Sequence, residues 1–103
     1  MQKAVFLYVT FGSHEQAMRA IDCLMAQRLV ACANVFATQR GLQWTGASSR
    51  EGETVVLFKT LQERAADAVH FLQDLHGFDI PCISQANVEV TDSFGEWLYK
   101  ECA

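Results

Sequence analysis

Three side chains that can bind metal ions lie close together in the sequence. His76 offers an imidazole nitrogen, Asp79 a carboxylate and Cys82 a thiol. Imidazole nitrogens suit copper, nickel and zinc, and thiolates bind soft metals tightly. The segment therefore contains a candidate site for copper or another divalent metal ion, with His76, Asp79 and Cys82 as its ligands.

Each of these residues also has a structural interpretation. His76 follows the last apolar position of an expected helix, where an imidazole can bond the terminal carbonyls and interact favourably with the helix dipole. One His at this position cannot complete a closed metal site, which favours the capping role. Asp79 fits a solvated turn, and Cys82 fits a small buried hydrophobe, as unpaired cysteines usually are.

A second group of residues could line a ligand cleft. Lys59 is expected at the end of a central strand with apolar neighbours, where its ammonium could meet an anion or pair with Asp79 or Glu89. A purely structural ion pair explains Lys59 equally well. Trp44 and Phe78 could line the same cleft, although aromatic residues more often belong to a core or an interface.

Composition and charge exclude several classes of function. The 103 residues are 50% hydrophobic and carry a net charge of −4, without a basic stripe that could neutralise phosphates. Nucleic acid is therefore not an expected partner. No apolar run approaches the ~20 residues of a membrane-spanning helix. The length predicts a single domain over residues 1–103.

The cysteines are not arranged as a zinc ribbon or a thioredoxin-like motif. They occupy positions 23, 32, 82 and 102, so no Cys-x-x-Cys pair exists. The N-terminal apolar run is short and lacks a small-residue cleavage site, which argues against a signal peptide. A cytoplasmic protein with reduced thiols is therefore expected.

The elements that position these residues can be predicted from hydrophobic periodicity. Arg28–Val35 reads as a strand that is apolar on both faces and must be covered on both. Further strands are expected over 4–11, 53–60 and 80–90, and the strand from Arg28 is expected to continue to Trp44 with an interruption around 38–41. Capping-box spacing predicts helices that begin at Ser13, Thr60 and Ser93.

The resulting order is β-α-β-β-α-β with a short C-terminal helix. This order predicts an α+β, ferredoxin-like split β-α-β fold, in which both main helices cover one face of a four-stranded antiparallel sheet. Apolar side chains are also expected on the other face. Because two helices cannot cover both faces, we expect an oligomer.

Several segments resemble the CutA family of divalent-cation tolerance proteins. Gln27–Val35, QRLVACANV, resembles the family segment (E/Q)RLAACVNI. Four more segments match family motifs in the family's order: 44–46 (WTG, family WEGK), 58–60 (FKT, family IKT), 76–83 (HGFDIPCI, family HPYEVPEI) and 93–98 (SFGEWL, family xYLxWL). The resemblance covers nearly the whole chain.

The resemblance implies a compact homotrimer whose sheets pack together at the centre, with a role in tolerance of divalent ions, copper especially. Members that look able to bind copper carry a Cys and a second His where this chain has Val9 and Leu75. Gly77 and Phe78 replace the usual Pro and Tyr, and Cys82 replaces an acidic residue. The departures predict that copper binds more weakly here than in those relatives.

Three functions remain possible on the sequence. The first is a trimeric metal-tolerance protein, and the second is a trimeric regulatory or scaffold module that binds a small ligand or a protein. The third, an enzyme, is disfavoured because no phosphate loop, Gly-x-Ser-x-Gly or His-Glu-x-x-His motif occurs. We expect His76, Asp79, Cys82 and Lys59 to converge near an inter-subunit cleft, with Trp44 of a neighbouring chain close by.

Overall fold

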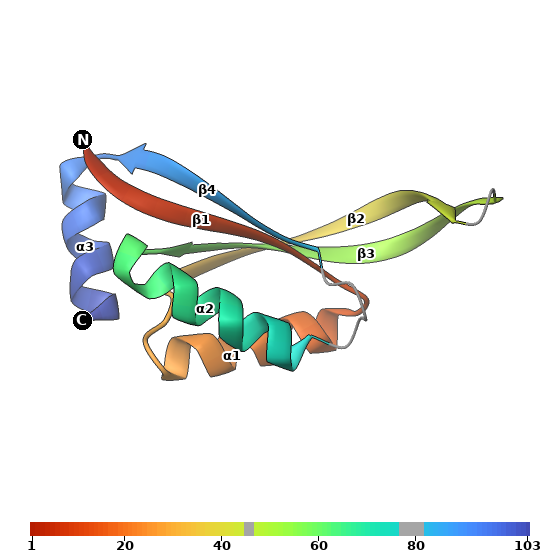
Figure 1. Ribbon diagram of the computed structural model, residues 1–103, viewed down its shortest axis with the longest axis horizontal. Coiled ribbons are helices and arrows are strands. Elements are labelled where there is room, and N and C mark those ends of the chain that lie inside the picture. The colour runs from red at the N-terminus through yellow and green to blue at the C-terminus, as the bar shows by residue number, and fades with distance from the viewer. Residues whose placement is uncertain (45–46, 77–81) are drawn as a thin grey trace.

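The computed structural model describes residues 1–44, 47–76 and 82–103, and for residues 40, 42–44 and 47–51 it describes the backbone alone (Figure 1). The elements are β1 (Gln2–Phe11), α1 (His14–Ala26), β2 (Cys32–Trp44), β3 (Ala47–Thr60), α2 (Gln62–Leu75), β4 (Ile83–Val90) and α3 (Asp92–Cys102). This order confirms the predicted β-α-β-β-α-β arrangement with a C-terminal helix.

The four strands form one antiparallel sheet in the order β2-β3-β1-β4. The pairing of β1 with β3 ends at Phe11 and Thr54, whereas β2 and β3 stay paired as far as Trp44 and Ala47. The β2–β3 hairpin therefore extends beyond the other two strands, as Figure 1 shows. The predicted interruption of β2 around 38–41 is wrong.

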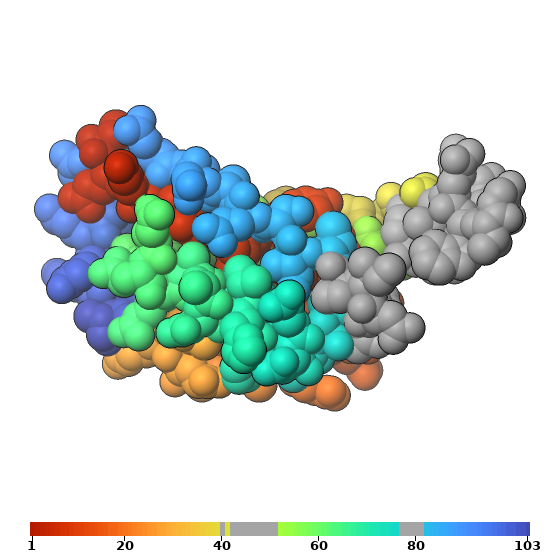
Figure 2. Space-filling model, in the orientation of Figure 1, coloured from red at the N-terminus to blue at the C-terminus, as the bar shows by residue number. Residues whose placement is uncertain are grey.

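The main core lies between the sheet and the two long helices, which cover the same face (Figure 1). Alternate residues of β1 point to this face, as the period of a strand requires. On the visible surface of Figure 2, side chains of α2 lie beside those of β4. The core side chains come from β1 (Val5, Leu7, Val9, Phe11), β3 (Val56, Phe58), α1 (Ala17, Ala20, Ile21, Leu24) and α2 (Ala65, Ala68, Leu72).

The opposite face of the sheet carries exposed aromatic side chains. Tyr8 is 46% exposed and Phe36 is 48% exposed. Directly paired residues lie on the same side of a sheet, so Phe36 shares a face with its partner Val55, and Val55 with Thr10. Neither α1 nor α2 covers this face, which agrees with the apolar face expected from the sequence.

Helix α3 crosses the end of the sheet near the N-terminus of β1 (Figure 1). It builds a second, smaller core in which Leu98 and Cys102 are fully buried beside Ala4. Its last carbonyls accept hydrogen bonds from two arginines: Arg64 Nε donates to Cys102 O at 2.9 Å, and Arg28 Nη1 donates to Glu101 O at 3.5 Å. These cations satisfy carbonyls that a helix end leaves without a partner.

The four thiols should differ in reactivity at neutral pH. Burial raises the pKa of the Cys102 thiol, whereas Cys82 is exposed. Because the thiolate is the reactive form, Cys82 should react first with a thiol reagent and Cys102 last. Mass spectrometry after timed alkylation measures the order. Modification of Cys102 in the folded protein at the rate of Cys82 would contradict it.

The segment before β2 differs from its prediction. β2 begins at Cys32, and Arg28 adopts a left-handed backbone conformation with φ 57° instead of starting a strand. The buried hydroxyl of Thr60 donates to Leu29 O at 2.6 Å. The Thr60 hydroxyl therefore fixes this turn and does not cap a helix.

One of the three predicted helix caps is confirmed. Ser13 is the N-cap of α1, and its Oγ accepts from the Gln16 N–H at 3.1 Å. The caps predicted at Thr60 and Ser93 are wrong, because α2 and α3 have Leu61 and Thr91 as N-caps, without a side-chain cap bond. The predicted start of the last strand at residue 80 lies outside the described residues.

Candidate functional site

Two of the predicted metal ligands meet the backbone of Thr10 at the end of β1. The Thr10 N–H donates to Cys82 O at 3.2 Å, and the Thr10 carbonyl lies 2.6 Å from His76 Nε2. Regular pairing of β1 with β4 ends one residue earlier, at Val9 and Ile83. The structure therefore brings the backbones of the His76 and Cys82 segments to one end of the sheet.

The imidazole of His76 has a defined role in packing. A carbonyl can only accept, so Nε2 is the donor to Thr10, and in the neutral ring the lone pair lies on Nδ1. The ring stacks on Phe11 with centroids 5.1 Å apart and planes at 21°. The His76 backbone N–H donates to Leu72 O at 2.9 Å and closes the end of α2. The predicted cap is thus made by the backbone, and the contacts of the ring with Thr10 and Phe11 tie α2 to β1.

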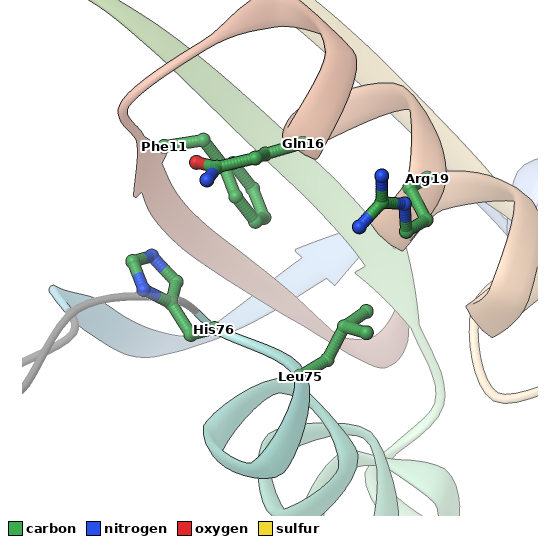
Figure 3. A pocket seen from close by; sticks show the side chains of 5 residues that line it. All are labelled: Phe11, Gln16, Arg19, Leu75 and His76. Carbon is green, nitrogen blue, oxygen red and sulfur yellow. The ribbon is translucent and has the colours of Figure 1, made fainter.

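A small pocket lies beside His76, between α1 and the end of α2 (Figure 3). It has a volume of about 130 Å³. Phe11 and Leu75 contribute apolar surface, and Gln16 and Arg19 of α1 contribute polar groups, as Figure 3 shows. Gln16 and Arg19 are not among the site residues predicted from the sequence. Their spacing of three residues, which places them on the same side of a helix, is the signal that could have found them.

Cys82 reaches this region from the other side of the sheet. Ile83 pairs with Val9, so alternation along the strand places the Cys82 side chain on the face away from α1 and α2. His76, in contrast, stacks on Phe11, whose side chain belongs to the core under the helices. Among residues 1–44, 47–76 and 82–103, no three His, Cys, Asp or Glu side chains are grouped closely enough to hold a metal ion.

Lys59 occupies a different part of the sheet. Its Nζ lies 5.5 Å from the ring centroid of Phe6 and 5.7 Å from that of Phe94, distances typical of cation–π contacts. Within the described part of one chain it has no ion pair, and a pair with Glu89 or Asp79 in a cleft between subunits stays a prediction.

Within one chain, Lys59 and His76 do not converge. Lys59 pairs with Phe6, four residues before Thr10, which corresponds to roughly 13 Å along a strand. Lys59 and its partner Phe6 also lie on the face opposite to Phe11. Convergence between neighbouring chains stays a prediction.

The remaining predicted site residues are Trp44, Phe78 and Asp79. Trp44 is the last residue of β2 and stands opposite Ala47, but only its backbone is described. Phe78 and Asp79 lie outside the described residues. Their predicted roles stay predictions.

Within residues 1–44, 47–76 and 82–103, no helix has both the length and the apolar character that are needed to cross a membrane.

Comparisons with known proteins agree on one family. The model of the family "CutA1 divalent ion tolerance protein" matches residues 5–101. A divalent-cation tolerance protein CutA from Thermotoga maritima is 32% identical over 95 residues, which are 91% of this chain and 94% of that protein.

Solved structures show the same likeness in three dimensions. The divalent ion tolerance protein CutA1 from Ehrlichia chaffeensis superposes with a TM-score of 0.95 at 27% identity, covering 100% of this chain and 98% of that one. A protein from Archaeoglobus fulgidus, described as a periplasmic divalent cation tolerance protein CutA, gives a TM-score of 0.91 at 26% identity, covering 97% of this chain and 99% of that one. With a family match over nearly its whole length and the same four-stranded fold, the chain belongs to the CutA1 divalent ion tolerance protein family.

Proposed function

We propose that this protein is a homotrimer that contributes to tolerance of divalent cations by weak binding of copper or a similar ion. The observation that carries the proposal is the exposed thiol of Cys82 at the end of β1, in a chain that belongs to the CutA1 family. An imidazole and a thiol are ligands that copper accepts. The metal ion is the cargo of the protein in this proposal.

The arrangement favours weak binding over a closed site. Zinc and copper sites in proteins usually use three or four protein ligands. The His76 and Cys82 side chains of one chain lie on opposite faces of the sheet, so we propose that Asp79 or a neighbouring chain supplies the further ligands. Val9 is fully buried in the core and Leu75 lines the pocket, so neither position adds a ligand.

Copper binding should depend on Cys82 and His76. We expect the affinity for Cu²⁺, measured by calorimetry under oxygen-free conditions, to fall at least tenfold in Cys82→Ser, because an exposed thiolate ligand is lost. The affinity for Cu²⁺ should fall by a similar factor in His76→Ala. Cys23→Ser removes a half-buried thiol from α1 and serves as the matched control, with an unchanged affinity expected.

Unchanged affinity in both Cys82→Ser and His76→Ala would contradict the metal site. His76 would then be a structural residue that joins α2 to β1. That result would favour the second candidate, a trimeric regulatory or scaffold module whose inter-subunit clefts bind a small ligand or a protein. The observation in its favour is Lys59, whose charge lies between two aromatic rings without an acidic partner among the described residues.

The exposed aromatic face of the sheet supports the proposed trimer. Tyr8 and Phe36 lie on the face that α1 and α2 leave uncovered, and apolar burial between copies would stabilise an assembly. We propose that Lys59, Trp44 and Phe78 line clefts between the copies. We further propose that the protein acts by binding and not by catalysis, and that it works in the cytoplasm.

A further inference from the structure

The pocket beside His76 has a chemistry that differs from that of a metal site. Phe11 and Leu75 give it an apolar surface, and Gln16 and Arg19 border it with hydrogen-bond donors (Figure 3). The volume of about 130 Å³ corresponds to roughly four water molecules at ~30 Å³ each. The pocket therefore suits a small organic molecule with one apolar and one polar end.

The polar side of the pocket is cationic. Arg19 carries a guanidinium cation, which offers a planar set of hydrogen-bond donors. Within the described residues its guanidinium makes neither an ion pair nor a hydrogen bond, although Glu15 and Asp22 lie one turn away on the same helix. The side-chain amide of Gln16 likewise has no partner among those residues. Two sets of donors are thus available at the pocket.

The charge of Arg19 decides between a cation and an anion as the ligand. A metal ion inside the pocket would be repelled by the guanidinium, and none of the five lining residues carries an anionic group that offsets the repulsion, so copper at His76 would have to bind outside the pocket. A carboxylate, in contrast, accepts two parallel hydrogen bonds from a guanidinium. Its apolar body would rest on Phe11 and Leu75, which removes apolar surface from water.

We propose that the pocket formed by Phe11, Gln16, Arg19, Leu75 and His76 binds a small organic carboxylate. Arg19 holds the carboxylate, Gln16 donates to it, and the apolar part of the ligand contacts the ring of Phe11. The site lies within one chain and does not depend on Cys82 or on a metal ion.

The test uses benzoate as the probe and the full chain labelled for NMR. Benzoate should cause saturable shifts of the amide signals of Phe11, Gln16 and Leu75. Benzyl alcohol, which keeps the ring and lacks the charge, should bind at least tenfold more weakly. Arg19→Gln should weaken benzoate binding at least tenfold, because the charge-assisted bonds are lost. Lys100→Gln, which removes an exposed charge from α3, is the matched control and should change the affinity less than twofold.

Several results would overturn the proposal. Equal binding of benzyl alcohol would reduce the pocket to an apolar depression, and equal weakening by Arg19→Gln and Lys100→Gln would indicate a general charge effect. Saturation by inorganic phosphate without saturation by benzoate would assign the site to a different anion. The variant Cys82→Ser separates this site from the proposed metal function, since it should weaken copper binding and leave benzoate binding unchanged.

Discussion

Replacing Phe36 by Glu should convert the proposed trimer to single chains of 11.5 kDa. Phe36 lies on the face of the sheet that no helix covers and is 48% exposed in the single chain. In a trimer this face would be buried between copies, where an unpaired carboxylate costs several kcal/mol. Because each trimer would contain three such charges, the loss of assembly should be complete at micromolar concentration.

Light scattering coupled to size-exclusion chromatography measures the change. The natural sequence should give three times the mass of one chain, and Tyr8→Glu should behave as Phe36→Glu does. Met18 is exposed on the helix side of the molecule, so the variant Met18→Glu is the control and should remain trimeric. A natural sequence that elutes as a monomer would refute the trimer, and a trimeric Phe36→Glu would place the contacts elsewhere.

Replacing Phe58 by Ala should cause a large loss of stability in the chain. Phe58 is fully buried, pairs with Leu7 and points into the core beneath α1 and α2. Removing a buried phenyl ring loses its transfer free energy and leaves a cavity, with a typical cost of about 3–5 kcal/mol. That cost is a large share of the roughly 5–15 kcal/mol by which a domain is stable.

Chemical denaturation at a fixed protein concentration measures this loss, because the stability of an oligomer depends on concentration. Phe36→Ala is the matched control, since it deletes the same ring from a half-exposed position on the other face. In the monomeric Phe36→Glu background, a comparison of Phe58→Ala with the parent isolates the core. A loss below about 1 kcal/mol there would mean that the core can collapse around the missing ring.

The order of the elements and the packing of both main helices on one face of the sheet could be predicted from the sequence. The side chains of a strand alternate with a period of two residues, and those of a helix repeat every 3.6 residues. Each element can therefore be recognised from the pattern of its own residues. The cap at Ser13 was predictable for the same reason, because its partner is the N–H of Gln16, three residues away. A split β-α-β topology then follows, since right-handed crossovers leave few alternatives.

The partners of the polar side chains were decided by the tertiary structure. The sequence predicted that Thr60 caps the next helix, but its hydroxyl bonds to Leu29, 31 residues away. The ring of His76 bonds to the carbonyl of Thr10, 66 residues away, and Lys59 lies between Phe6 and Phe94. Gln16 and Arg19 meet Leu75 and His76 only because α1 and α2 pack side by side.

The tertiary structure decides these partners because burying a polar group without a hydrogen bond costs free energy. A hydroxyl, imidazole or carbonyl that leaves water must be satisfied by whichever group the fold brings near it. Hydrophobic periodicity is repeated over many residues of one element, so it can be detected in the sequence alone. A hydrogen bond joins two single atoms from distant elements, and its partner exists only after α2 has packed against the end of β1.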